Sequence, residues 1–188
     1  LDQLDTYQQV ATLAEGKRVL DCFSNQGGFG LACARAGAAA VTCIDISGEA
    51  ISAAKQNAEI NELNLHAVEA NAFDYLKTCK ETFDLIVLDP PSFTRSKKAL
   101  NDAMRGYKEI HLRALKLLNH DGYLATFSCS HHVTRELFLN NLRSAAVDAR
   151  RTLRLVESYS QRPDHPILPT IPETEYLKGF CVQLLPGR

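Results

Sequence analysis

The fold is decided by the stretch VLDCFSNQGGFG, residues 19–30. It opens as a short apolar run, typical of a buried strand, and then becomes polar and rich in glycine before helix formers follow in residues 31–36. A strand, a glycine loop and a helix in this order form nucleotide pockets in α/β folds, because glycine lets the backbone approach a ligand closely. The G-G-x-G spacing differs from the G-x-G-x-x-G of dinucleotide-binding folds. A tight turn without a ligand is the alternative, and the polar residues Ser24, Asn25 and Gln26 argue against it.

The rest of the chain alternates between apolar runs and amphipathic segments. This alternation predicts an α/β fold, a parallel sheet with helices on both faces. A proline-bearing loop over 161–174, with no helix, joins the last two strands and permits an antiparallel last strand. Thr134 is expected to cap the helix after the fifth strand, and an Asp121-Gly122 turn is expected before that strand. The predicted strands are 19–23, 40–45, 66–68, 83–88, 123–127, 153–159 and 178–185, and the main predicted helices are 47–61, 73–80, 101–118 and 134–149.

Length and composition limit the classes of protein to which the chain can belong. The chain has 188 residues, 45% of them hydrophobic, which suits one globular domain with a full core. Residues 1–16 are interpreted as a lead-in segment and 17–188 as the domain. No apolar run is long enough to cross a bilayer, so no membrane association is expected. The chain begins at Leu1 and its one methionine is Met104, so we expect a piece of a longer polypeptide.

The six cysteines are scattered and form no C-x-x-C pair. This pattern argues against a zinc site and against a disulfide framework. It predicts a reduced, cytoplasmic protein without a metal, in which most thiols are small buried hydrophobes. The net charge of −1 is not that of a strongly basic nucleic-acid binder, although residues 97–116 carry a cluster of basic side chains.

Polar residues follow each apolar strand at the point where ligands bind in open α/β sheets. Asp45 ends the second strand, where a carboxylate can accept hydrogen bonds from ribose hydroxyls; the alternative is a cap for the next helix. Asn71 follows the third strand, and an adenine contact and a helix cap are both open for it.

The fourth strand ends in Asp89-Pro90-Pro91. Two prolines after a carboxylate make a stiff platform, because proline fixes φ and cannot extend a strand ladder. A flat aromatic base could stack on this platform, with Phe93 beside it. A plain strand terminator, the alternative, needs neither the acid nor the second proline.

With these pieces in view, the chain resembles the class I S-adenosylmethionine-dependent methyltransferases. More narrowly, it is similar to the bacterial large-subunit rRNA cytosine-C5 methyltransferase family. The resemblance implies a Rossmann-like seven-stranded methyltransferase sheet with an antiparallel last strand, S-adenosylmethionine as cofactor, rRNA as partner and a preceding RNA-binding domain. The matching segments, in the family's order, are LDQ (1–3), CFS (22–24), GGF (27–29), DPP (89–91), RGYK (105–108), FSCS (127–130) and YLKGF (176–180).

The resemblance also implies roles for individual residues. Gly27 to Gly30 would pass the methionine part of the cofactor, Asp45 would take the ribose, and Asn71 with its neighbours would take the adenine. Tyr107, Lys108 and Lys178 are candidates for substrate contact by family position, beside Pro90, Pro91 and Phe93. The full set of expected cofactor-binding residues is Gln3, Ser24, Gly27, Gly28, Phe29, Gly30, Asp45, Ile46, Asn71, Ala72, Phe73 and Asp89.

Cys129 carries the predicted chemistry. Carbon 5 of cytosine is a poor nucleophile, and a thiolate that adds to carbon 6 activates it. Such a cysteine must be exposed in a polar setting, as in the loop 128–132. Asp89 is the second candidate catalytic residue; it could hold the cytosine and assist proton transfer. The alternative for Cys129 is a buried bystander.

Two other functions stay open at this point. The first is an RNA guanine or adenine methyltransferase in which Cys129 is incidental. The second is a non-catalytic module that binds RNA or a protein. A nicotinamide oxidoreductase fits least well, given the loop spacing and the Asp-Pro-Pro segment.

Overall fold

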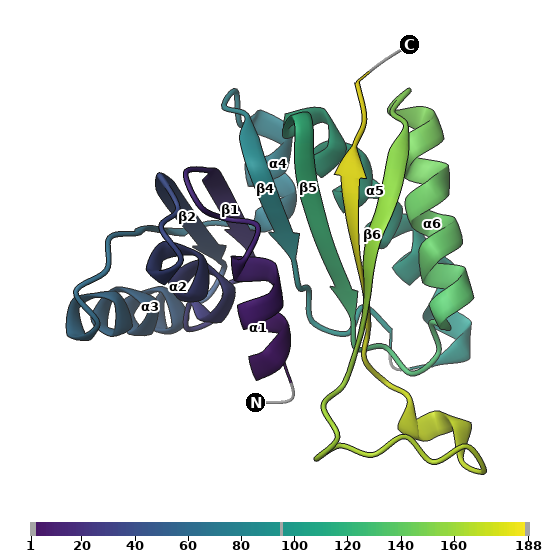
Figure 1. Ribbon diagram of the computed structural model, residues 1–188. Helices are drawn as coiled ribbons and strands as arrows, with labels where there is room; N and C mark the ends of the chain where they lie inside the picture. Colours follow the sequence, from purple (N-terminus) through teal and green to yellow (C-terminus); the bar gives the residue numbers. More distant parts are fainter. Residues whose placement is uncertain (1–2, 95, 187–188) are drawn as a thin grey trace.

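The computed structural model describes residues 3–94 and 96–186. Its strands form one seven-stranded sheet in the order β3-β2-β1-β4-β5-β7-β6 (Figure 1). Neighbouring strands pair in parallel except β7, which is antiparallel to both β5 and β6, so the predicted fold class and reversed last strand are confirmed. The strands are β1 (Arg18–Cys22), β2 (Ala40–Asp45), β3 (His66–Glu69), β4 (Phe83–Leu88), β5 (Leu118–Ser128), β6 (Leu153–Ser160) and β7 (Lys178–Leu184).

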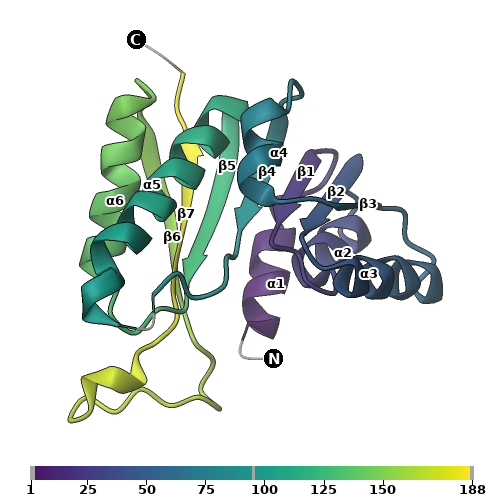
Figure 2. The same ribbon diagram turned by 180° about the vertical axis from the view of Figure 1, so that it is seen from behind.

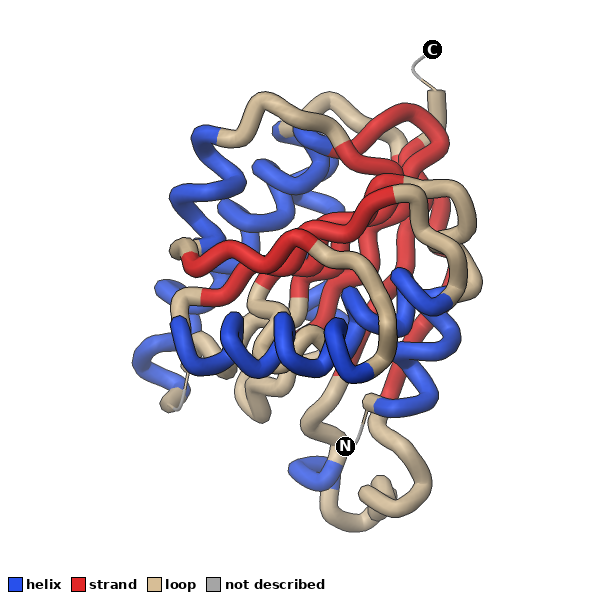
Figure 3. Tube along the Cα trace, turned by 90° about the vertical axis from the view of Figure 1, so that its left-hand side faces the viewer, coloured by secondary structure: helices blue, strands red, loops and turns tan. Residues whose placement is uncertain are grey.

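Helices cover both faces of the sheet (Figures 2 and 3). The predicted cap at Thr134 is confirmed, because its hydroxyl accepts the Leu137 N–H at 3.2 Å. One face carries α1 (Leu4–Ala11), α2 (Gly28–Arg35) and α3 (Gly48–Ile60), and the other carries α4 (Ala72–Thr78), α5 (Leu100–Leu117) and α6 (Arg135–Asp148), with 3-10 turns at Lys97–Ala99 and Pro172–Thr174.

The side chains of β1 show how the two faces are built. Leu20 and Cys22 point into the apolar cluster beneath α4, α5 and α6, whereas Val19 points into the cluster beneath α1 and α2. This alternation is the period of a strand that is buried on both faces. Residues 3–16, expected as a lead-in, pack with the domain: Val10 is fully buried, and the ring centroids of Tyr7 and Phe29 lie 4.5 Å apart.

The structure corrects the expected start of the fifth strand. β5 begins at Leu118, and Asp121 lies inside it with φ of 62°, where a turn between helix and strand was predicted. The pairing of β4 with β5 shifts register between Phe83 and Leu85 and so absorbs this local kink.

Asp21 lies in the core beneath the glycine loop. Its Oδ2 accepts the Gly30 N–H at 2.9 Å, and its Oδ1 has no hydrogen-bond partner among the described residues. Burial, with smaller contributions from the charges of Asp89 and Asp45, raises the pKa of Asp21 to about 8, against the opposing effect of the Gly30 bond. A Cβ at Gly30 would lie 2.3 Å from the Cys43 sulfur, so only glycine lets α2 pack this closely.

We expect Asp21→Asn to change how stability depends on pH. The folded-state pKa of Asp21 lies above its unfolded value, so the stability that the protonated carboxyl contributes is full below about pH 4 and is lost as the pH rises towards 8. Asparagine does not titrate. The free energy of unfolding of Asp21→Asn, measured relative to that of the wild type, should therefore increase between pH 5 and pH 8 by an amount on the order of 2 kcal/mol or more.

Urea unfolding of both proteins at pH 5, 7 and 8.5 measures this difference. Glu59→Gln, at an exposed position on α3, is the control and should follow the wild type at each pH. A constant difference between Asp21→Asn and the wild type across this range would contradict the assignment.

Candidate active site

A cavity of about 550 Å³ opens at the carboxyl edge of the sheet. It lies where the strand order reverses, because β1 and β4 are neighbours there and the chain leaves them in opposite directions. It brings together eight of the predicted site residues. The residues that line the cavity are Phe23, Asn25, Asp45, Ile46, Ser47, Ala50, Asn71, Ala72, Phe73, Asp89, Pro91 and Phe93.

Asp45 fastens the glycine loop to the end of β2. Its Oδ2 accepts the Asn25 N–H and its Oδ1 accepts the Ser47 N–H, both at 2.9 Å. The cap of α3 is Ser47, whose hydroxyl accepts the Ala50 N–H. Because Ser47 caps this helix, the Asp45 carboxylate is not needed for that purpose.

Asn71 lines the cavity and is also the cap of α4. Its Oδ1 accepts the Phe73 N–H at 2.9 Å, so the helix-cap alternative is realised. The side-chain amide nitrogen is the donor that remains for a ligand. Phe73 contributes to an aromatic wall with Phe23 and Phe93, whose ring centroids lie 5.9 to 6.4 Å apart.

The loop after β1 holds three residues in the left-handed region: Phe23 with φ of 62°, Asn25 with φ of 48° and Gly27 with φ of 84°. Only Gly27 adopts this conformation at no steric cost. Backbone strain of this kind concentrates at ligand sites. Sequence reasoning did not include Phe23, Ser47 and Ala50 in the site, although it pointed to Asn25 in the polar stretch after the first strand. Phe23 and Ser47 lie at or just after a predicted strand end, which is the signal that could have found them.

Several expected cofactor contacts do not line the cavity. Gln3 lies next to it: its Nε2 donates to Asp89 Oδ2 at 3.0 Å, and its buried Oε1 has no partner among the described residues. Phe29 is a correction, because its ring is buried against Phe127 with centroids 5.1 Å apart and faces the sheet. The cavity lining also excludes Ser24, Gly27, Gly28, Gly30 and Pro90, and the predicted residues Cys129, Tyr107, Lys108 and Lys178.

The donors and acceptors present fit the expected S-adenosylmethionine. Asp45 offers a carboxylate to ribose hydroxyls, and the aromatic wall offers an apolar face to a base. Asp89 and the unpartnered Gln3 Oε1 offer acceptors to a cationic group. A larger hollow of about 640 Å³ between α4 and α5 contains none of the strand-end residues.

The exit loops of β4 and β5 are tied together by hydroxyl groups. The Oγ atoms of Ser92 and Ser130 lie 3.0 Å apart. The Tyr107 hydroxyl lies 3.0 Å from Ser128 Oγ and 3.2 Å from Ser130 Oγ. Cys129, between these two serines, is partly exposed. Its exposure differs from that of four other cysteines, which are buried: Cys22, Cys33, Cys43 and Cys181.

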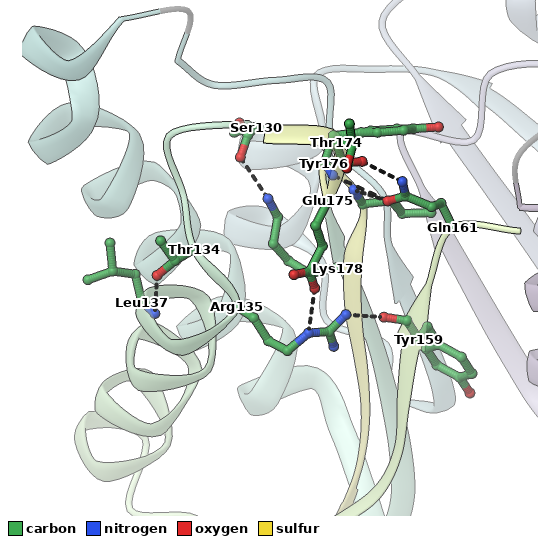
Figure 4. A network of polar contacts seen from close by, with 11 residues as sticks. Ser130, Thr134, Arg135, Leu137, Tyr159, Gln161, Thr174, Glu175, Tyr176 and Lys178 are labelled. Atoms are coloured by element: carbon green, nitrogen blue, oxygen red, sulfur yellow. Dashed lines mark hydrogen bonds and ion pairs between the residues drawn. The ribbon is translucent and has the colours of Figure 1, made fainter. Parts of the chain in front are cut away.

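The three predicted substrate contacts of α5 and β7 need correction. Tyr107 is completely buried, with its ring centroid 4.6 Å from that of Phe93. Lys178 is also buried, and its Nζ donates to Ser130 O at 2.7 Å (Figure 4). Both side chains support the loop that carries Cys129 and do not reach the surface. Lys108 instead forms an ion pair with Asp148 at 2.8 Å and lines the hollow between α4 and α5.

Among the described residues, no group of three or more His, Cys, Asp or Glu side chains could hold a metal ion. The described helices also include none with the length and apolar character required to cross a membrane.

Comparisons with known proteins agree with the fold. A family described as a methyltransferase domain matches residues 13–168. "Ribosomal RNA large subunit methyltransferase I" of Escherichia coli O1:K1 / APEC is 42% identical over 98% of this chain and 48% of the relative, and that of Shigella boydii serotype 18 matches equally well. The chain thus spans about half the length of these curated relatives.

Solved structures share the fold. A Streptococcus mutans protein described as a SAM-dependent methyltransferase has a TM-score of 0.86 and 24% identity, over 97% of this chain and 49% of that one. NSun6 from Pyrococcus horikoshii with SFG has a TM-score of 0.72 and 17% identity, over 98% of this chain and 51% of that one.

We expect Asp45→Ala to weaken S-adenosylmethionine binding by about tenfold or more, because hydrogen bonds to a charged acceptor contribute about 1.5–3 kcal/mol. The substitution also leaves the Asn25 and Ser47 N–H groups without their acceptor. Isothermal titration calorimetry measures the dissociation constant. Asp74→Asn, at an exposed position of α4, should bind as the wild type does; an unchanged affinity in Asp45→Ala would refute the role.

Proposed function

The chain belongs to the methyltransferase-domain family, and on this premise we propose that it methylates carbon 5 of a cytosine in rRNA with Cys129 as the nucleophile. S-adenosylmethionine is the cofactor of this domain and supplies an electrophilic methyl group when bound. The observation that carries the proposal is the partly exposed Cys129, held between Ser128 and Ser130 beside the loop that follows Asp89. The names of the curated relatives support rRNA as the substrate.

In the proposed reaction, the Cys129 sulfur forms a bond to the cytosine and is released again at the end. The thiolate adds to carbon 6 of the cytosine and forms a C–S bond, which makes carbon 5 nucleophilic. Carbon 5 then forms a bond to the methyl carbon as the sulfonium–methyl bond breaks. A base removes the carbon-5 proton, the C–S bond breaks, and the thiolate is regenerated.

Asp89 and the residues after it would position the base. The Asp89 carboxylate lines the cavity and accepts a hydrogen bond from Gln3 Nε2, and a carboxylate is an acceptor that suits the cytosine amino group. Pro91 and Phe93 line the same cavity and offer flat or apolar surfaces to the ring. Pro90 is buried, and its ring fixes the backbone φ between Asp89 and Pro91.

We expect the wild-type chain to form a covalent adduct with rRNA that contains 5-fluorocytidine, in the presence of S-adenosylmethionine. Fluorine at carbon 5 cannot leave as a proton does, so the C–S bond to Cys129 persists. Cys129→Ala should form no adduct, whereas Cys79→Ala, at a partly buried cysteine far along the chain, should form as much as the wild type. Denaturing gels and peptide mass spectrometry detect the adduct.

Calorimetry with S-adenosylmethionine is the accompanying control, because Cys129→Ala should keep its affinity for the cofactor. Methylation of RNA without any Cys129-dependent adduct would sink the covalent mechanism and favour a guanine or adenine target. Absence of cofactor binding in the wild type would favour a non-catalytic module.

A further inference from the structure

Lys178 is an unusual residue for the core of this domain. It is the first residue of β7, pairs with Ser128 across the β5–β7 ladder and is 2% exposed. Its Nζ donates to the carbonyl oxygen of Ser130 at 2.7 Å (Figure 4). The residues that Lys178 touches therefore flank Cys129 on both sides in the sequence. A lysine is rarely this deeply buried unless another group compensates its charge.

The nearby acids do not provide that compensation by direct contact. Glu175 pairs with Arg135 at 3.1 Å, and Lys178 forms no ion pair with any described residue. Burial lowers the pKa of Lys178 to about 8; the negative forms of Cys129 and then Glu175 act in the opposite direction, and Arg135 adds to the lowering. Of the groups that oppose this lowering, Cys129 in its thiolate form has the largest effect.

Tyr107 is another titratable group that contacts this loop, and His131 and His132 follow Ser130 in the sequence. The Tyr107 hydroxyl contacts Ser128 and Ser130, and burial together with the Cys129 charge raises its pKa, so it stays neutral. Among the described residues, Lys178 is the one buried lysine or arginine, and its Nζ bonds to the residue that follows Cys129. A cation beside a cysteine favours the thiolate, which is the nucleophilic form.

We propose that Lys178 is a positioning residue for Cys129: it fixes the exit loop of β5 through Ser130 O and stabilises the Cys129 thiolate with its charge. This inference rests on the proposed function for its biological purpose, but the state of the thiol can be measured without RNA. It replaces the direct substrate contact expected for Lys178 with an indirect role.

The test is the rate at which iodoacetamide alkylates Cys129, followed by peptide mass spectrometry so that the other cysteines do not interfere. In Lys178→Met, the rate at pH 7 should fall about threefold to tenfold, because a smaller thiolate fraction is partly offset by the higher nucleophilicity of a more basic thiol. Lys178→Gln keeps a donor for Ser130 O without the charge and should show the same loss. Lys108→Met, the same change at a partly exposed lysine, should react as the wild type does.

The pH dependence of the alkylation rate distinguishes an effect of the Lys178 charge on Cys129 from an effect of Lys178 on the position of the loop. Near pH 9.5 the wild-type Lys178 is neutral and most thiols are ionised, so the rates of all variants should converge. A rate ratio that stays constant from pH 6.5 to 9.5 would indicate altered access to the loop and would overturn the electrostatic role. Unchanged rates in Lys178→Gln would overturn the proposal outright, and this variant decides the matter if Lys178→Met does not fold.

The alkylation experiment tests the role of Lys178 whether or not the proposed cytosine reaction is correct. A slower, pH-dependent alkylation in the Lys178 variants together with no RNA adduct in the wild type would keep the role of Lys178 and reject the cytosine mechanism. A Cys129 adduct with unchanged alkylation in the variants would do the reverse.

Discussion

The parallel pairing of β1 with β4, from Val19 opposite Leu85 to Cys22 opposite Leu88, is the contact on which both halves of the site depend. It places the glycine loop beside the Asp89 segment at one edge of the sheet. The side chains of β4 from Leu85 to Leu88 are fully buried, so both faces of this strand belong to the core. Pairing of β4 with β5 then carries the same edge one strand further, to Cys129.

The strand ends were predictable because the apolar runs of a doubly covered sheet are easy to recognise. Asp45, Asn71 and Asp89 each follow such a run, and the structure lines one cavity with all three. The helix cap at Thr134 was predictable for a similarly local reason, since a hydroxyl before an amphipathic segment satisfies a free N–H.

Burial of polar side chains was not predictable from the sequence. Tyr107 and Lys178 look like surface residues of a binding protein, and only the packing of α5 and β7 against the Cys129 loop reveals that both are enclosed. The same holds for Phe29, whose direction depends on how α2 sits over Phe127. Tertiary contacts of this kind leave no periodic signal, because each involves a single residue of an element whose pattern is otherwise ordinary.

The reversed direction of β7 explains how a lysine comes to lie beside Cys129. In a parallel strand the last residue would reach the carboxyl edge of the sheet; in the antiparallel β7 the first residue, Lys178, does. Its position therefore depends on the segment before it, which Gln161 holds: its Oε1 accepts the N–H groups of Tyr176 and Leu177 at 3.2 Å (Figure 4). Gln161 thus anchors the chain immediately before β7, and Lys178 begins the strand with its Nζ bonded to Ser130 O.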